Sequence, residues 1–197
     1  MKNFIVSVDG PAGSGKQLIS KYIAKKYNFF HLDSGILYRR LAFKILKEKI
    51  NLNNTNEIKK FVKFQKIISY RNHPNLRMEE ISKTSSLIAI NEFVRIFINK
   101  QQKIIVKKML KSYAGCVIDG RDIGSKVFKK ARIKLFITTK AEIRAKRRHK
   151  QLIELGEKSI HGQILKEIKL RDKLDKTRNY SPLVIPKGAI IINNSDK

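Results

Sequence analysis

The sequence predicts an α/β protein in which helices surround a central, mainly parallel sheet. Short apolar runs alternate along the chain with longer amphipathic or charged segments, as strands and helices do around a parallel sheet. The chain has 197 residues, of which 42% are hydrophobic. This is enough to bury a core but too little for two full domains. We therefore expect a single domain over residues 1–197.

The expected elements follow one another in a regular order. An apolar run near the N-terminus predicts a buried strand, a glycine-rich turn comes next, and apolar residues recur at helical spacing from Gln17. The expected strands cover residues 4–8, 29–32, 116–118, 133–137 and 189–192. The expected helices begin at residue 17 and cover residues 36–49, 79–91, 92–111, 141–155 and 159–176.

Residues 51–77 interrupt this order, because they are polar and rich in Asn. We expect them to form an inserted subregion rather than another layer of the sheet. Within it, residues 67–70 resemble a short strand and residues 73–75 a turn.

The formal net charge is +28, from 44 basic and 16 acidic residues. Such a charge suits nucleic acid, an acidic membrane surface or a small anionic substrate. The basic residues are spread from Lys2 to Lys197, so a Lys-rich surface without a dedicated partner explains the charge equally well. We expect small-molecule ligands and a monomer, and neither nucleic acid nor a membrane as partner.

Two further features of the sequence indicate a cytoplasmic protein. The N-terminal residues run straight into a glycine-rich turn and do not resemble a signal peptide, and no apolar stretch is long enough to span a membrane. The single Cys116 excludes a disulfide framework and a thiolate metal cluster, which fits a reducing compartment.

Residues 10–16 match the Gly-x-x-x-x-Gly-Lys pattern of a phosphate-binding loop. Glycines let successive backbone N–H groups point into one concavity, and the N-terminus of the next helix adds partial positive charge. Lys16 would bring a full charge to the β and γ phosphates. A turn without a ligand is the alternative, but glycines, lysine, strand and helix coincide here. We expect a bound nucleotide and the three-layer fold of P-loop proteins.

Gln17 departs from the general form of this loop. It stands where many such loops carry the Ser or Thr that contacts Mg²⁺. The metal can still be held through waters and a carboxylate, and Asp119, directly after the strand at 116–118, is placed for this. A plain turn residue at the strand end is the alternative. No direct metal ligand is expected.

Several arginines stand next to polar residues that suit recognition of a ligand. Phosphoryl transfer requires positive charge around the phosphate oxygens, and a planar guanidinium grips two oxygens better than an ammonium does. Each arginine by itself fits a surface ion pair, and the last group fits simple pairing along a helix. The residues are Ser34 with Arg39, Arg121 with Asp122, and Arg171 with Asp175 and Arg178.

In these motifs and their order, the sequence resembles the bacterial cytidylate (CMP) kinases, which are nucleoside monophosphate kinases. The resemblance runs along nearly the whole chain. The phosphate loop is shared by many enzymes, whereas Asp-Ser-Gly-x-x-Tyr-Arg and Gly-Arg-Asp-Ile-Gly in this order are far more specific. The segments that carry the resemblance are residues 8–16, 32–39, 119–124, 141–148 and 171–183.

The resemblance implies transfer of the γ-phosphoryl group of ATP, with Mg²⁺, to CMP or dCMP. Residues 51–80 would bind the acceptor, and residues 155–182 would form a lid. The residues implied for ATP are Gly10, Pro11, Ala12, Gly13, Ser14, Gly15, Lys16, Gln17 and Leu18. Those implied for the acceptor are Ser34, Arg39, Arg121 and Arg178 at its phosphate, Arg171 and Asp175 at its pentose, and Ser86, Lys103 and Asp122 at its base. The cations implied in catalysis are Lys16, Arg121, Arg171 and Arg178.

The carboxylate of Asp122 suits the amino group of cytosine, whereas uracil would present a carbonyl oxygen to it. A mispaired buried polar group costs about 1–3 kcal/mol. We therefore expect CMP to be preferred over UMP by roughly ten- to a hundredfold.

The sequence also departs from the family pattern. Gln17 and Leu18 replace a small residue and a Thr, Lys103 stands in place of an Arg, and Leu174 replaces a charged residue. The chain ends at Lys197, where the family continues into a helix, so we expect apolar sheet surface to be exposed. These departures leave room for a weak or altered enzyme.

Three alternatives stay open at this point. The first is a kinase of the same fold for another acceptor, such as UMP, AMP or shikimate. The second is a basic P-loop protein that binds nucleic acid, and the third is a nucleotide-binding remnant without turnover. We expect no function for Cys116 or for the histidines, which lack metal-ligand spacing: His31, His73, His149 and His161.

Overall fold

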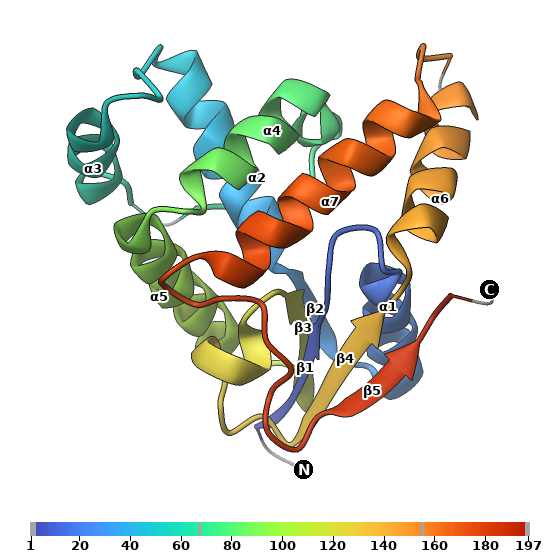
Figure 1. The fold of residues 1–197 in the computed structure, drawn as a ribbon. Coiled ribbons are helices and arrows are strands. Elements are labelled where there is room, and N and C mark those ends of the chain that lie inside the picture. Colours follow the sequence, from blue (N-terminus) through green and yellow to red (C-terminus); the bar gives the residue numbers. More distant parts are fainter. Residues whose placement is uncertain (1–2, 67, 155, 196–197) are drawn as a thin grey trace.

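A parallel sheet forms the centre of the fold (Figure 1). The structure is a computed structural model that describes residues 3–66, 68–154 and 156–195, and these residues contain five strands in the order β2-β3-β1-β4-β5. Every neighbouring pair among them is parallel, which confirms the predicted α/β class. The strands are β1 (Phe4–Asp9), β2 (Phe30–Asp33), β3 (Gly115–Gly120), β4 (Ile133–Thr138) and β5 (Ile190–Asn193).

Helices connect these strands, as a parallel sheet requires. They are α1 (Lys16–Tyr27), α2 (Ser34–Lys47), α3 (Thr55–Lys63), α4 (Glu79–Ile88), α5 (Glu92–Met109), α6 (Ala141–Glu154) and α7 (His161–Thr177), with two short helical turns, η1 (Pro74–Arg77) and η2 (Ile123–Val127). None of the helices in the described residues is long and apolar enough to cross a membrane.

Both faces of the sheet are covered, and strand β3 shows why. Side chains alternate between the faces of a strand, and all of β3 is buried. Cys116 and Ile118 pack into a core with residues of α2, α4 and α5, whereas Val117 packs into a second core with Ala24 of α1. The sheet therefore lies between two helical layers, which gives the predicted three-layer arrangement.

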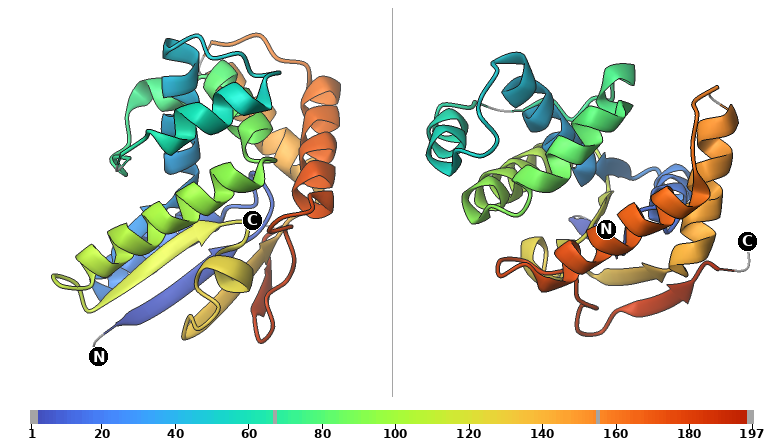
Figure 2. Two further views of the ribbon diagram at one scale, coloured as in Figure 1. Left: turned by 90° about the vertical axis from the view of Figure 1, so that its left-hand side faces the viewer. Right: turned by 45° about the horizontal axis from the view of Figure 1, so that its top comes forward.

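The helices beyond these layers gather at the carboxyl edge of the sheet. Helices α2, α3 and α4 form one group, and the antiparallel pair α6 and α7 forms another, with α7 crossing this edge (Figures 1 and 2). The pair has a small core of its own around Ala145, Leu152 and Ile164. The carboxyl ends of β1, β2 and β3 lie at this edge, where parallel sheets bind ligands.

The inserted subregion differs from the prediction. Residues 55–63 form helix α3, which the polar composition did not indicate. Its N-terminus is capped by Asn54, whose side-chain oxygen accepts from the backbone N–H groups of Asn56 and Glu57. Residues 68–70 form no strand, residue 67 lies outside the described residues, and the helical turn η1 replaces the expected turn at 73–75. The expectation that this region adds no strand to the sheet is confirmed for its described part.

Elsewhere the predicted elements agree with the structure within a few residues. Helix α2 begins at Ser34 rather than at residue 36, because the side chain of Asp33 accepts a hydrogen bond from Gly35 N at 2.8 Å and caps it. On the edge strand β5, the side chains of Ile190 and Ile191 are 60% and 56% exposed, so apolar sheet surface is uncovered there, as predicted.

Candidate active site

The loop between β1 and α1 is shaped by glycines where side chains would not fit. Gly10 and Gly15 have φ angles of 153° and 87°, which other residues rarely adopt. A Cβ at Gly10 would collide with the carbonyl oxygen of Ile137, and one at Gly15 with the side chain of Asn194. The loop therefore lies tightly between β4 and the segment after β5, and it leads directly into the N-terminus of α1, where anions bind favourably.

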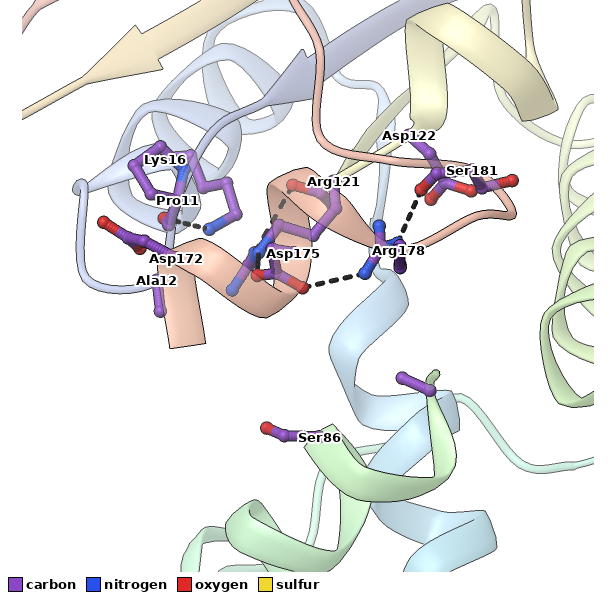
Figure 3. A network of polar contacts seen from close by, with 12 residues as sticks. Pro11, Ala12, Lys16, Ser86, Arg121, Asp122, Asp172, Asp175, Arg178 and Ser181 are labelled. Carbon is purple, nitrogen blue, oxygen red and sulfur yellow. Dashed lines mark hydrogen bonds and ion pairs between the residues drawn. The ribbon is translucent and has the colours of Figure 1, made fainter. Parts of the chain in front are cut away.

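Lys16, the first residue of α1, lies folded beneath this loop. Its side chain is buried, and Nζ donates to the carbonyl oxygen of Pro11 at 3.0 Å (Figure 3). Burial, followed by the positive charge of Arg121, lowers the pKa of Lys16 to about 7. An anion bound at the loop would reverse this effect, because it would stabilise the charged ammonium.

Asp175 of α7 joins two of the expected arginines (Figure 3). Arg121 Nε donates to Asp175 Oδ2 at 2.9 Å, and Arg178 Nη1 donates to Oδ1 at 2.7 Å. Burial raises the pKa of Asp175, but the surrounding guanidinium groups lower it by more, so the pKa lies below its ordinary value. The carboxylate therefore holds both arginines in place as an ion.

Arg171, one turn before Asp175 on α7, completes a cluster of positive charge. Burial, followed by the charges of Arg121 and Arg39, lowers its pKa to about 10. Arg171 in turn contributes to the lowered pKa of Lys16. Side chains from the phosphate loop, α2, the end of β3 and α7 thus converge, although they are far apart in the sequence.

The end of β2 brings Ser34 and Arg39 to the same place. Asp33 Oδ2 accepts from Arg39 Nη2 at 3.0 Å and from Gln17 Nε2 at 2.9 Å. Ser34 is buried beside the loop after β3, since a Cβ on Gly120 would approach its Oγ to 2.6 Å. The side chain of Gln17 therefore points towards Asp33 and Arg39, whereas Leu18 is 75% exposed.

Asp119, the expected indirect metal ligand, is paired with His31. Their Oδ2 and Nε2 atoms are 2.6 Å apart. Burial raises the pKa of Asp119, and the hydrogen bond with His31 lowers it by less. No function was expected for His31, so this pairing was missed. It arises because β2 and β3 are neighbours, with Asp33 beside Asp119 in register.

At the far end of the cluster, Asp122 forms a buried ion pair with Arg95 of α5. Arg95 Nη2 and Asp122 Oδ1 are 2.7 Å apart, and both side chains are at most 3% exposed. Among the described residues, Asp122 Oδ2 and Arg178 Nη2 are buried without a hydrogen-bond partner. The second carboxylate oxygen of Asp122 and one amino group of Arg178 thus keep unused hydrogen-bonding capacity.

Arg95 is a site residue that the sequence analysis missed. A signal was present, because Arg95 lies on the apolar face of its helix with Val94 and Ile98, and all three are buried. A buried arginine needs a partner, and that partner is Asp122.

The structure does not bring Lys103 to this cluster, which corrects the sequence expectation. Lys103 is exposed on another face of α5, where it lines a pocket of about 350 Å³ with Lys126 and Tyr180. Seven residues make almost two helical turns, so Gln102 and not Lys103 shares the face of Arg95. Gln102 is fully buried.

Ser86 of α4 lies apart from the arginines and across from α7 (Figure 3). Its Oγ donates to the backbone oxygen of Ser82 at 3.1 Å. It belongs to the helical group opposite the phosphate loop, and in this structure it joins none of the hydrogen bonds around Asp175.

Comparison with known proteins identifies the family. The sequence model of the cytidylate kinase family matches residues 6–197. The chain belongs to the cytidylate kinase family. A cytidylate kinase of Rickettsia akari is 38% identical over 195 residues, covering 99% of this chain and 86% of the relative. One of Fusobacterium nucleatum is 37% identical over 206 residues, covering 100% and 92%.

A solved structure agrees with the fold of this cytidylate kinase family member. The Thermus thermophilus protein TT1252 matches with a TM-score of 0.50 over 99% of this chain and 90% of its own. Its sequence is only 13% identical, so this likeness shows the fold alone.

Helices α6 and α7 of this family member are tied to the phosphate loop by Arg144. Its guanidinium donates to the carbonyl oxygens of Thr139 and Ala12, at 2.9 and 3.1 Å, and to both carboxylate oxygens of Asp172 on α7. The side chain of Arg144 is buried. This residue lies in the segment 141–148 that carried the resemblance, but the sequence did not single it out.

Proposed function

We propose that this protein transfers the γ-phosphoryl group of ATP to CMP or dCMP, forming ADP and CDP or dCDP. Membership of the cytidylate kinase family supports this reaction. The observation that carries it in the structure is the convergence of Lys16, Arg121 and Arg171 between the phosphate loop and the Asp122–Arg95 pair. We infer that a polyphosphate would bind at one end of this site and a base at the other.

The phosphate loop is the proposed donor site. The backbone of residues 10–16 and the start of α1 would bind the polyphosphate of ATP, with Lys16 beside its terminal phosphates. Mg²⁺ fits the residues present, because Asp119 is a buried carboxylate near Lys16, and a nearby positive charge stabilises its ionised form. Asp119 would hold the metal through water, as Mg²⁺ keeps much of its hydration shell. When bound, the metal would neutralise charge on the transferring phosphates.

The arginine cluster is the proposed acceptor site. Ser34, Arg39, Arg121 and Arg178 would bind the acceptor phosphate, and Arg171 and Asp175 the pentose. For the base we retain Ser86 and Asp122, and we replace Lys103 by Arg95. Cytosine would donate its amino group to the oxygen of Asp122 that has no partner in the described residues, while the Arg95 guanidinium, whose Nε also has none there, would meet its acceptor atoms.

The residues of this site would promote the reaction by positioning and by charge. The acceptor is an already ionised phosphate oxygen, so no general base is required. Lys16, Arg121, Arg171 and Arg178 would balance the negative charge that gathers where the two phosphates meet.

The region 155–182 would close over the nucleotides as a lid and exclude water, which would otherwise accept the phosphoryl group. Residues 51–80 would cover CMP. A monomeric state and a cytoplasmic location stay predictions of the sequence.

A panel of acceptors tests this proposal. Purified protein is incubated with ATP, Mg²⁺ and each of CMP, dCMP, UMP, AMP and shikimate, and the products are separated by ion-exchange chromatography. We expect CDP and dCDP, with UMP used roughly ten- to a hundredfold less efficiently. No diphosphate from any nucleotide, or faster turnover of another acceptor than of CMP, would overturn the proposal.

A further inference from the structure

Gln17 makes a hydrogen bond that ATP binding by the phosphate loop alone does not explain. It lies in the first turn of α1, next to Lys16, at the position where phosphate loops commonly carry a hydroxyl. Its amide group reaches away from the loop, and Nε2 donates to Asp33 Oδ2 at 2.9 Å. This hydrogen bond joins the start of α1 to the end of β2.

Asp33 is fixed from three directions. Its Oδ1 accepts from Gly35 N at 2.8 Å, and its Oδ2 accepts from Gln17 and from Arg39 Nη2, the latter at 3.0 Å. The Asp33 side chain is only 11% exposed. Because both oxygens are engaged, the orientation of this carboxylate depends on each donor, and Gln17 is the only one of the three from outside the β2–α2 segment.

Asp33 in turn sets the position of Arg39. It is the ion-pair partner of Arg39 in the described residues, and it holds Nη2. The Nε of Arg39 is buried without a hydrogen-bond partner in the same part of the chain. The guanidinium of Arg39 is therefore anchored to Asp33 through Nη2, and its Nε–H keeps unused hydrogen-bonding capacity close to Arg171.

We propose that Gln17 is a positioning residue of the acceptor site, which acts on the CMP phosphate through Asp33 and Arg39. This inference rests on the proposed function and deepens it. The amide of Gln17, at a position where the family pattern has a small residue, would then link the donor loop to the acceptor arginine. Loss of the amide would leave Asp33 free to turn, so Arg39 would have to be ordered again when CMP binds.

The test compares Gln17→Ala with two matched variants. Gln17→Glu keeps the size of the side chain but cannot donate to Asp33 and adds a like charge. Lys21→Ala changes the exposed side chain one turn further along α1. The dissociation constant for CMP is measured by calorimetry without ATP or metal. We expect Gln17→Ala to weaken CMP binding by about three- to tenfold, Gln17→Glu to weaken it at least as much, and Lys21→Ala to leave it unchanged.

A double-mutant cycle with Arg39→Ala separates positioning from a general structural effect. If Gln17 acts through Arg39, then Gln17→Ala has almost no further effect on CMP binding in the Arg39→Ala protein. Additive effects, unchanged CMP binding in Gln17→Ala, or a loss confined to ATP binding would each overturn the inference.

A ligand-free readout keeps this inference distinct from the proposed function. The Arg39 Nε–H signal in a ¹H–¹⁵N NMR spectrum, assigned with Arg39→Lys, should shift in Gln17→Ala and stay unchanged in Lys21→Ala. Failure of the wild-type protein to bind CMP would count against the proposed function alone. An Arg39 signal that is unaffected by Gln17→Ala would count against the role of Gln17.

Discussion

At the scale of single residues, the buried ammonium group of Lys16 lowers the stability of the folded protein but favours the binding of an anion. The ammonium group is buried next to Arg121 and Arg171, and its pKa is lowered to about 7 from its ordinary value of 10.5. Below pH 7 the folded protein bears the full cost of this buried charge. Between pH 7 and 10.5 the unfolded chain binds the proton more strongly than the folded protein does, so stability rises with pH in this window.

We predict that Lys16→Met will make the protein more stable and inactive. Removal of the buried charge should raise the free energy of unfolding at pH 7 by about 0.5–2 kcal/mol, while kcat should fall at least about a hundredfold. The rise of stability between pH 7 and 9 should be smaller in the variant than in the wild type. Urea titrations at both pH values check this. A destabilised variant, or one with a near-normal rate, would contradict the role given to Lys16.

A second residue-scale prediction concerns the base. Asp122→Asn turns a free acceptor oxygen into an amide that can also donate, so the CMP-over-UMP ratio of kcat/KM should fall towards one. The change also weakens the buried pair with Arg95, and removal of one partner from such a pair costs about 3–5 kcal/mol. Steady-state kinetics with both acceptors, on protein whose folding is checked by circular dichroism, measures the ratio. An unchanged ratio would show that Asp122 does not read the base.

At the scale of elements, two ion pairs join α6 to α7 in different surroundings. Arg144 and Asp172 are 3% and 15% exposed, whereas Glu142 and Lys169 are both 59% exposed. Buried and exposed ion pairs differ strongly in what they contribute to stability. The exposed pair can therefore serve as a control for the buried one.

We predict that Asp172→Ala will loosen the proposed lid and that Lys169→Ala will not. Without Asp172, the buried guanidinium of Arg144 loses its counterion while it still holds Ala12 of the phosphate loop. We expect unfolding to become easier by about 3 kcal/mol, a higher KM for ATP, and faster proteolysis within residues 155–182. Urea unfolding, kinetics and a timed digest measure these effects. Equal behaviour of the two variants would show that the Arg144–Asp172 pair does not hold α7 to the phosphate loop.

The elements also show how far the sequence predicts this structure. The strands were found because buried parallel strands are nearly continuous apolar runs, as in β3. Helix α3 was missed because its helical signal is a cap at Asn54 and only two buried residues, Ile58 and Val62, within a polar segment.

The candidate site residues fall into two groups in the same way: some belong to sequence motifs, and others depend on how distant segments pack. Lys16 and Arg121 belong to sequence motifs, and the structure brings them close together as expected, because each motif places its side chains locally. Arg95 and the contact of Gln17 with Asp33 depend on how α5 and β2 pack against distant segments. Lys103 was misplaced because neighbouring residues of a helix point in different directions.

At the scale of the whole molecule, the net charge of +28 should affect the rate at which nucleotides bind more than the rate of phosphoryl transfer. Positive potential attracts an anionic substrate over a distance that salt shortens. We predict that kcat/KM for CMP falls severalfold as NaCl rises from about 0.05 to about 0.5 M, while kcat changes little. Kinetics in a salt series at constant Mg²⁺ measures both. A fall in kcat alone would contradict steering.

The proposed reaction requires two nucleotides to meet end to end beside a cluster of positively charged side chains. The most direct test follows labelled phosphate from γ-³²P-ATP in the presence of CMP and Mg²⁺. We predict that the label appears in CDP, that little is released as inorganic phosphate, and that Lys16→Met abolishes the transfer. Label found mainly in inorganic phosphate, or no loss of label from ATP, would contradict the account.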